Sequence, residues 1–369
     1  MHYFVPDRPS PLPQDSQQQQ YEGQQGMSRT LQMALQESRE IVPSSSGSTA
    51  SGSAQGGRTV EDVPQSALFP DGSRNFADEP REITAETKLS DLTDAQILQL
   101  TQELREEEIV KRPLISPVEP LSHLEEEYLH GSTTVVHKLQ WLERQGWRGI
   151  RRTRGDGDCF YRSLAFSYVE RLLLAPDPAL AVAMSLSTLQ DGRHLLDEAG
   201  FQELVYEDFY DVLVSLISAV VSPPAPGAPL LSGPQLLTAF QDAETSNSIV
   251  VYLRLLTSAY IRANEGDFLP YLFSPDTGDL LDVREFCERE VEASGKEADH
   301  VQEMALAKAL RIKVRIAYID SNPSGRGAEE GKVDFVTFES EGSADNGIHE
   351  IALLYRPGHF DVLETRDRE

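Results

Sequence analysis

The sequence predicts an α+β domain that is mostly helical and ends in a small antiparallel sheet. Two observations lead to this fold class. Between residues 92 and 310, apolar side chains recur at intervals near 3.6 residues in one segment after another, which is typical of amphipathic helices. After residue 311 the pattern changes to short alternating or continuous apolar runs between turn-forming residues, which indicates strands. No internal repeat is visible, which argues against a solenoid.

The predicted helices follow one another along the chain. The first spans 92–112 and the second spans 135–147, with Trp141 and Trp147 as candidate core residues. A third spans 159–174, where apolar residues at every fourth position form one stripe that faces the core. Further helices are predicted at 178–191, 205–221, 233–242, 247–264, 282–291 and 298–310. Strands are predicted at 312–320, 333–339 and 351–355, with a short strand after Gly358.

Residues 1–85 share none of these patterns. They contain a glutamine run at 17–20, the stretch SSSGSTASGSAQGG at 44–57 and many prolines. Such a composition cannot bury enough apolar surface to offset the entropy lost on ordering. We therefore expect a disordered, low-complexity tail at 1–85 and one globular domain at 86–369.

The chain is strongly acidic. Its net charge is −27, and residues 1–85 carry 6 basic and 11 acidic side chains, so −22 of that charge belongs to the predicted domain. An acidic surface repels nucleic acid and anionic lipid and favours a basic or mixed-charge protein partner, although solubility alone is an equally good explanation. The longest apolar stretch, at 212–221, is about half as long as a membrane span.

The chain has two cysteines and no signal-peptide pattern. We therefore expect a soluble protein in the reducing environment of the cytoplasm, and also of the nucleus.

The stretch GDGDCFYRSL, at 155–164, places Cys159 where a glycine-rich turn meets a predicted helix. A cysteine attacks as its thiolate, and the free amides and dipole of a helix N-terminus favour the anion. Asp158 is a candidate N-cap residue, and Gly155 and Gly157 permit backbone angles at which successive amides converge. The pattern predicts acyl transfer, in which Cys159 attacks a carbonyl carbon and amides of the turn stabilise the oxyanion.

The general base is predicted in YRPGHFDVL, where His359 and Asp361 lie on one face of a short strand. At that spacing the carboxylate reaches the imidazole, orients it and stabilises its charged form, which leaves the other ring nitrogen for the thiol. Of the eight histidines, His359 alone comes with an orienting group. The preceding Arg-Pro-Gly turn is expected to direct the chain into the strand without taking part in the chemistry.

Structural roles are the alternative for each half of this constellation, because a lone cysteine is usually a small buried apolar residue. The coexistence of the two halves favours catalysis. A calcium loop and a dinucleotide fingerprint are excluded because Phe160 and Tyr161 occupy positions that need an oxygen ligand or glycine. No cluster has zinc spacing, so neither a metal nor a cofactor is expected. Cys287 lies within a predicted helix among acidic neighbours, which raise a thiol pKa, and we predict a structural role for it.

At these residues the chain resembles the otubain branch of the ovarian-tumour-type cysteine deubiquitinases. The resemblance covers roughly residues 105–364 in family order. Its blocks are RTRGDGDCFYRSLAFSYVERLL, SIVVYLRLLTSAYI, VREFCEREVE, EADHVQEMALAKAL and LLYRPGHFDVL. It implies a papain-like fold and a ubiquitin thioesterase that hydrolyses the isopeptide bond between the ubiquitin C-terminus and lysine, without metal or cofactor.

The resemblance assigns Cys159 as the nucleophile, His359 as the general base and Asp361 as its orienting carboxylate. It also assigns Asp156 as the motif aspartate whose backbone belongs to the oxyanion site. Asp158 departs from the family pattern, which usually has asparagine there. Its charge disfavours a neighbouring thiolate and is expected to slow the enzyme, but either residue can cap the helix, so we expect activity to survive.

The partners implied by the resemblance are ubiquitin, polyubiquitin and ubiquitin-conjugating enzymes. The helix at 92–112 is the counterpart of the family arm that contacts them; packing on its own domain is the alternative. In the tail, Leu31, Ala34 and Ser38 have the spacing of a ubiquitin-interacting motif, which predicts a helix at 28–41. The acidic run that normally precedes this motif is missing, so chance similarity is the alternative there.

Two functions follow. The first is a thiol-dependent deubiquitinase, and the alternative is a non-catalytic regulator that binds ubiquitin or a ubiquitin-conjugating enzyme. Retention of Cys159, His359 and Asp361 together favours the enzyme, because a pure binding protein gains nothing from all three.

Overall fold

The computed structural model describes residues 93, 97, 109–320, 331–340 and 350–365, all within the compact unit Ile83–Glu369. The predicted tail lies outside the described residues, together with the helix at 28–41 and its Leu31, Ala34 and Ser38. Most of the predicted helix at 92–112 lies outside them as well, although residues 109–111 are helical.

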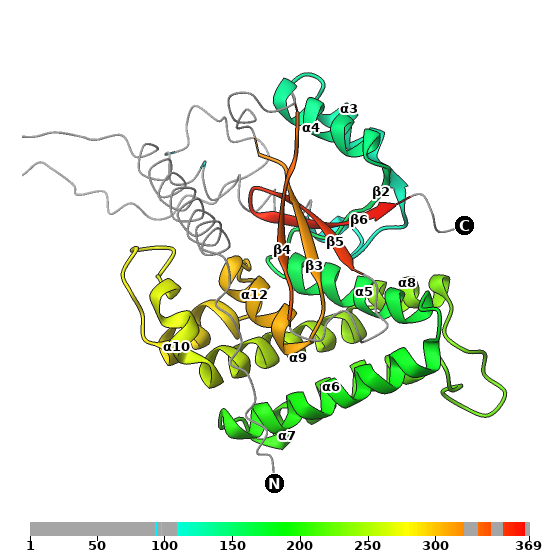
Figure 1. The fold of residues 1–369 in the computed structure, drawn as a ribbon, viewed down its shortest axis with the longest axis vertical. Helices are drawn as coiled ribbons and strands as arrows, with labels where there is room; N and C mark the ends of the chain where they lie inside the picture. Colours follow the sequence, from blue (N-terminus) through cyan, green and yellow to red (C-terminus); the bar gives the residue numbers. More distant parts are fainter. Residues whose placement is uncertain (1–92, 94–96, 98–108, 321–330, 341–349, 366–369) are drawn as a thin grey trace, which may run out of the picture. The chain divides into compact units, whose positions relative to one another are not determined.

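A mixed six-stranded sheet forms the centre of the described part of the chain (Figure 1). Its strand order is β1-β2-β6-β5-β3-β4, and β3 and β5 pair in parallel while the other neighbours pair antiparallel. The strands are β1 (Glu119–Pro120), β2 (Trp147–Arg151), β3 (Val314–Tyr318), β4 (Asp334–Phe338), β5 (Ile351–Arg356) and β6 (His359–Thr365).

The α+β fold class is confirmed, but the predicted sheet is wrong in two respects. Strands β1 and β2 precede Cys159, so the sheet is not confined to the C-terminal quarter. The β3–β5 pair is parallel because β4 turns back along the outer edge of β3, and the chain then returns to β3's other edge. Strand β2 was missed because it is only five residues long and has a glycine at its centre. The parallel pair was missed because the direction of a strand depends on partners that are distant in the sequence.

Helices cover both faces of the sheet (Figure 1). Along β5, Leu353 belongs to the larger core beside α5, whereas Leu354 belongs to a second core with α3 and α4, because successive side chains of a strand point to opposite faces. The helices are α3 (Leu121–Tyr128), α4 (Thr133–Arg144), α5 (Cys159–Leu173), α6 (Pro178–Glu198), α7 (Glu203–Ser218), α8 (Gly233–Gln241), α9 (Ala243–Ala263), α10 (Glu265–Phe268), α11 (Val283–Phe286) and α12 (His300–Ala309). Two single turns join them, the 3-10 turn η2 (Leu269–Tyr271) and the π turn η3 (Cys287–Val291).

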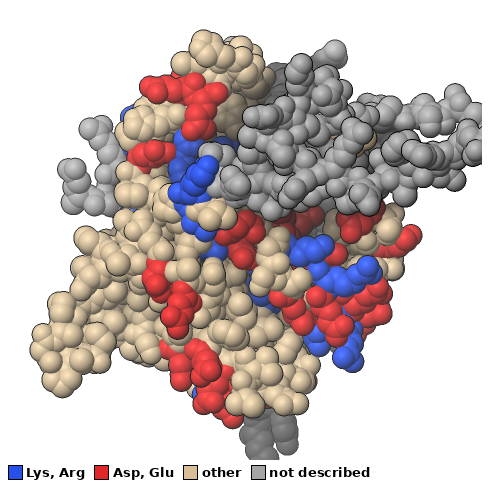
Figure 2. All heavy atoms as spheres, turned by 180° about the vertical axis from the view of Figure 1, so that it is seen from behind, with Lys and Arg blue, Asp and Glu red and all other residues tan. Residues whose placement is uncertain are grey.

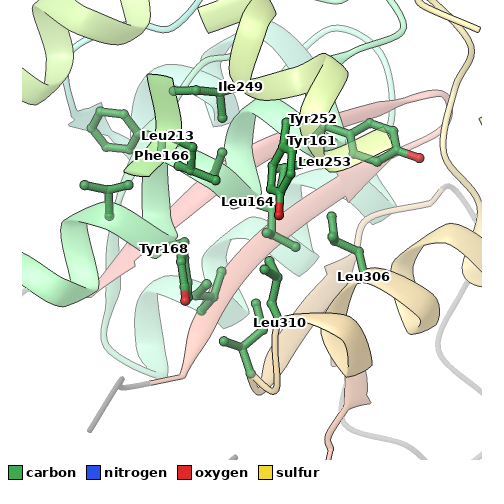
Figure 3. Close-up of a cluster of buried hydrophobic side chains, with 14 of the residues drawn as sticks. Tyr161, Leu164, Phe166, Tyr168, Leu213, Ile249, Tyr252, Leu253, Leu306 and Leu310 are labelled. Carbon is green, nitrogen blue, oxygen red and sulfur yellow. The ribbon is translucent and has the colours of Figure 1, made fainter. Parts of the chain in front are cut away.

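Helix α5 carries the predicted nucleophile at its first residue and is buried on all sides. The predicted helix at 159–174 is confirmed, but the prediction of a single apolar stripe is wrong, since residues 159–172 are all buried. The reason is that α5 packs against β5 and β6 on one side and against α6, α8 and α9 on others. Figure 3 shows the surrounding cluster, in which Leu164 lies among side chains of the neighbouring helices.

The remaining predicted helices are confirmed with shifted ends. The helix predicted over 135–147 ends at Arg144, and Gly146, with φ 95°, leads into β2. Trp147 is a core residue, as predicted, but lies on that strand. The segment predicted at 282–291 is α11 followed by the π turn η3. Within the described ranges, no helix combines the length and the apolar composition that crossing a membrane requires.

Leu164→Ala tests whether α5 is the central element of the core. Leu164 has no exposed surface, so the change removes buried methyl groups and leaves a cavity. We expect the free energy of unfolding, measured by urea denaturation, to fall by about 2–5 kcal/mol. The matched control is Leu204→Ala, whose side chain is 86% exposed and whose expected loss is below about 0.5 kcal/mol. Equal losses in the two variants would contradict this packing.

Candidate active site

Cys159 is the first residue of α5 and is 2% exposed. The turn before it owes its shape to two glycines that act in different ways. Gly157 has φ 81°, as the sequence predicts, and a Cβ there would lie 1.9 Å from the carbonyl oxygen of Gly295. At Gly155 a Cβ would lie 3.3 Å from Nδ1 of His359, so a larger residue there would press against the imidazole. The turn therefore fits closely against two distant segments.

His359 and Asp361 lie two residues apart on β6, as predicted, and their side chains meet. Nε2 of His359 lies 2.9 Å from Oδ1 of Asp361, and Cys159 lies close enough to the imidazole to raise its pKa. Since Nε2 faces the carboxylate, Nδ1 is the ring atom left for the thiol. The structure thus brings together the three residues that the sequence singles out, from positions 200 residues apart.

Asp361 is completely buried, and three donors surround it. Besides His359, the backbone N–H of Thr153 donates to Oδ1 at 2.9 Å, and the guanidinium of Arg356 donates to Oδ2 at 2.7 Å. Burial alone would raise the pKa of this carboxyl, but the hydrogen bonds and the charges of His359 and Arg356 outweigh it and hold the pKa below its ordinary value. Asp361 is therefore a carboxylate at neutral pH.

Burial lowers the pKa of His359, yet its hydrogen bonds to Asp361 and Cys159 outweigh burial and raise the pKa to about 9. The imidazole is therefore charged at neutral pH when it faces the thiol. A cation at this position stabilises a thiolate and can later donate a proton to a leaving group. These are the two properties that thiol-dependent acyl transfer needs.

Asp156 holds the turn through its side chain. Its Oδ1 accepts a hydrogen bond from the backbone N–H of Asp158 at 3.1 Å and another from Arg162 at 2.8 Å. Because the Asp158 amide donates to this carboxylate, it is not available to an oxyanion. The sequence analysis predicted all the amides of this turn as oxyanion donors. Without Asp158, the candidate donors at 156–159 are the amides of Asp156, Gly157 and Cys159.

Asp158 occupies the N-cap position of α5, but the prediction that its side chain caps the helix is wrong. Its Oδ1 instead accepts hydrogen bonds from the guanidinium of Arg254 on α9 and from the backbone N–H of Gly295. Arg254 is fully buried, and its charge compensates that of Asp158. The charge beside Cys159 is therefore paired with a buried cation.

Cys287 is the first residue of the π turn η3. It is fully buried, its Sγ lies 3.8 Å from the carbonyl oxygen of Ser258, and burial is the main cause that raises its thiol pKa. A structural role fits these observations. Among the described residues, no group of three or more His, Cys, Asp and Glu side chains could hold a metal ion.

Sequence reasoning missed three residues of the site: Thr153, Arg254 and Arg356. One of them had a usable signal. Pro357 and Gly358 form a two-residue turn, in which Gly358 has φ 72°. Such a short turn places Arg356 directly opposite His359 in the β5–β6 pair. The Arg-Pro-Gly turn thus also positions a hydrogen-bond donor to Asp361, which the sequence analysis did not predict. Thr153 and Arg254 had no local signal, because their partners lie 208 and 96 residues away.

This chain is similar to several known proteins. A family model described as peptidase C65 otubain matches residues 107–365. The ubiquitin thioesterase OTUB1 of Homo sapiens is 34% identical over 270 residues, which cover 73% of this chain and 90% of that protein. The ovarian tumor domain-containing deubiquitinating enzyme 1 of Arabidopsis thaliana is 33% identical over 262 residues, which cover 70% of this chain and 83% of that protein.

A solved structure is similar as well. The complex of h/ceOTUB1 with ubiquitin aldehyde and UBC13~Ub contains a chain with a TM-score of 0.60 and 29% sequence identity, over 75% of this chain and 100% of that chain. The predicted papain-like fold is confirmed by these matches. The matched segment contains Cys159, His359 and Asp361, and the chain belongs to the otubain family of cysteine peptidases.

Proposed function

We propose that this otubain is a thiol-dependent deubiquitinase in which Cys159 is the nucleophile, His359 the general base and acid, and Asp361 the carboxylate that orients His359. One observation carries the proposal: His359 hydrogen-bonds the carboxylate of Asp361, and Cys159 lies close enough to the imidazole to raise its pKa. The substrate is the isopeptide bond between the ubiquitin C-terminus and a lysine. Relatives named ubiquitin thioesterases and deubiquitinating enzymes support this substrate class.

The reaction has two halves. In the first, the Cys159 thiolate attacks the carbonyl carbon of the isopeptide, and the tetrahedral oxyanion collapses to a thioester as the C–N bond breaks. The leaving lysine amine takes its proton from the His359 imidazolium. In the second half, neutral His359 removes one proton from a water molecule, whose oxygen attacks the thioester. The C–S bond then breaks, which restores the Cys159 thiolate beside the His359 imidazolium, and the carboxylic acid that is released loses its own proton to solvent.

The oxyanion donors in this proposal are the amides of Cys159 and of the turn before it, apart from that of Asp158. The amide of Cys159 belongs to the first turn of α5, where backbone N–H groups have no partner within the helix. The positive end of the helix dipole lies at the same place and favours the developing negative charge.

Ubiquitin and polyubiquitin are the proposed partners, and their basic binding face suits an acidic enzyme. In Figure 2 the acidic side chains form several separate clusters, some of them interleaved with Lys and Arg. On this face the acidic side chains do not form one continuous patch. We therefore expect the negative charge to speed the encounter with a basic partner and not to define one binding surface. We extend the proposal to ubiquitin-conjugating enzymes because h/ceOTUB1 was solved with UBC13~Ub.

Ubiquitin carrying a thiol-reactive electrophile at its C-terminus tests the nucleophile. We expect a covalent adduct with the wild type and with Cys287→Ala, no adduct with Cys159→Ala, and labelling slowed by at least about 100-fold in His359→Ala. Intact mass spectrometry would measure the adduct, and Cys287→Ala is the matched control because it removes the other thiol. A wild type that binds ubiquitin without being modified would support the alternative, a non-catalytic ubiquitin-binding regulator.

The pH dependence of hydrolysis tests His359 and Asp361. Because the imidazolium is the proposed acid, kcat/KM for a fluorogenic ubiquitin amide should fall as pH rises through about 9, the pKa of His359. Asp361→Asn removes the anion that raises this pKa, so the fall should move to lower pH and the plateau should drop by about 100-fold or more. The exposed Asp276→Asn is the control and should leave the profile unchanged. An unshifted alkaline limb in Asp361→Asn would count against the proposed role.

The tail is proposed to bind ubiquitin through Leu31, Ala34 and Ser38. A tethered second binding site raises the effective concentration of ubiquitin at the active site. Deleting residues 28–41 should then slow the cleavage of long ubiquitin chains by about tenfold and leave diubiquitin cleavage nearly unchanged. Gel assays with chains of defined length measure this, and a scrambled 28–41 segment is the control. Equal effects on long and short chains would contradict the proposal.

A further inference from the structure

Arg254, on α9, donates five hydrogen bonds, all close to the nucleophile turn. Its Nε and Nη2 donate to Oδ1 of Asp158 at 2.9 and 2.6 Å, and Nη2 also donates to the carbonyl oxygen of Gly157 at 3.1 Å. The other two bonds go to the carbonyl oxygens of Val291 and Lys296 at 2.9 and 2.6 Å. The guanidinium has no exposed surface, and it also lies over the ring of Tyr161, 4.3 Å from the centroid.

These bonds hold the peptide unit between Gly157 and Asp158 from both ends. Its carbonyl accepts from Arg254, and its N–H donates to the carboxylate of Asp156. Because a peptide unit is planar, two bonds on opposite edges fix its orientation. The side chain of Asp158 is held by the same guanidinium, so the backbone of Asp158, at φ −99° and ψ 4°, has little freedom. The direction of the next amide, that of Cys159, follows from these angles.

The same guanidinium joins the turn to residues 291–296. Gly295 donates its N–H to Asp158 Oδ1 at 3.1 Å, and its carbonyl oxygen lies so close to Gly157 that no Cβ fits between them. Arg254 links the two segments, because it donates to the carbonyl oxygen of Gly157 in the turn and to those of Val291 and Lys296 in the other segment. A planar, forked donor can serve several oxygens at once, which an ammonium group cannot do with the same geometry.

We infer that Arg254 is a positioning residue for hydrolysis, which aims the oxyanion-binding amide of Cys159 by clamping the Gly157–Asp158 peptide against residues 291–296. The inference rests on the proposed function. The five hydrogen bonds of Arg254 go to Asp158 and to backbone carbonyl oxygens, and none of them goes to the thiol or to His359. Asp158 is the acceptor that this clamp requires beside the nucleophile. An asparagine at 158 would keep the acceptor oxygen but not the charge that pairs with Arg254.

The test uses the full chain with Arg254→Lys, Asp158→Asn and the control Arg171→Lys. Arg171 is also a buried arginine, but it lies in the last turn of α5. Three readouts are compared: kcat and KM for a fluorogenic ubiquitin amide, alkylation of Cys159 by iodoacetamide, and hydrogen exchange of the backbone at residues 155–164. Alkylation reports the thiolate and does not need the oxyanion site, so it separates positioning from collapse of the site.

For Arg254→Lys we expect kcat to fall about 10- to 100-fold with KM nearly unchanged, because a displaced oxyanion donor acts on the transition state. Alkylation should stay within about twofold, and exchange at the turn should become at least about tenfold faster. Asp158→Asn keeps the acceptor oxygen but leaves the buried guanidinium without its counter-charge, so kcat should fall and exchange should become faster, both by less than in Arg254→Lys. Arg171→Lys should change neither kcat nor exchange. Should Arg254→Lys fail to fold, Asp158→Ala removes two of the five bonds and is used in its place.

Two results would overturn the inference. One is an unchanged kcat in Arg254→Lys, and the other is a loss of kcat matched by an equal loss of alkylation, which would indicate general disruption. A wild type that does not hydrolyse ubiquitin amides would refute the proposed function instead. In that case exchange at residues 155–164 still decides the inference, because unchanged protection in Arg254→Lys would exclude the clamp.

Discussion

The burial of the Asp361 carboxylate is the constraint on which the active site depends. A buried charge that loses its partner costs about 3–5 kcal/mol, so every donor around Asp361 has to be supplied by the fold. Thr153 supplies a backbone N–H from the segment that follows β2, and Arg356 supplies a guanidinium from the end of β5. His359 completes the set from β6 itself. The position of the imidazole is thus set by the same contacts that stabilise three neighbouring segments of the sheet.

The two aspartates of the sequence GDGD are understood in the same way. Each is paired with an arginine that has no exposed surface, Asp156 with Arg162 on α5 and Asp158 with Arg254 on α9. Two negative charges next to a thiolate would oppose its formation if they stood alone. Because each carboxylate is paired with a guanidinium, the turn can use both as hydrogen-bond acceptors while most of their negative charge is compensated. Carboxylates also accept several donors at once, which a glycine-rich turn needs to stay in one conformation.

Much of this could be predicted from the sequence, and the limits have physical causes. Helix positions follow from local spacing, so α5, α9 and α12 were predicted close to their observed ranges. The hydrogen-bonded pair of His359 and Asp361 on β6 was predictable because the two residues are neighbours on one strand. The roles of Thr153 and Arg254 were not, since they exist only through contacts between distant segments. The full burial of α5 was missed for the same reason, because a helix with polar residues on every face looks half exposed until its neighbours are known.

The position of β6 has a consequence for the synthesis of the protein. Of the six strands, β6 is the last along the chain, yet it lies between β2 and β5 in the sheet. Until it emerges from the ribosome, β2 and β5 have no common neighbour, and the Cys159 thiol has no imidazole beside it. On the proposed mechanism, a chain of this kind remains inert until β6 is in place, and the onset of its reactivity coincides with closure of the sheet.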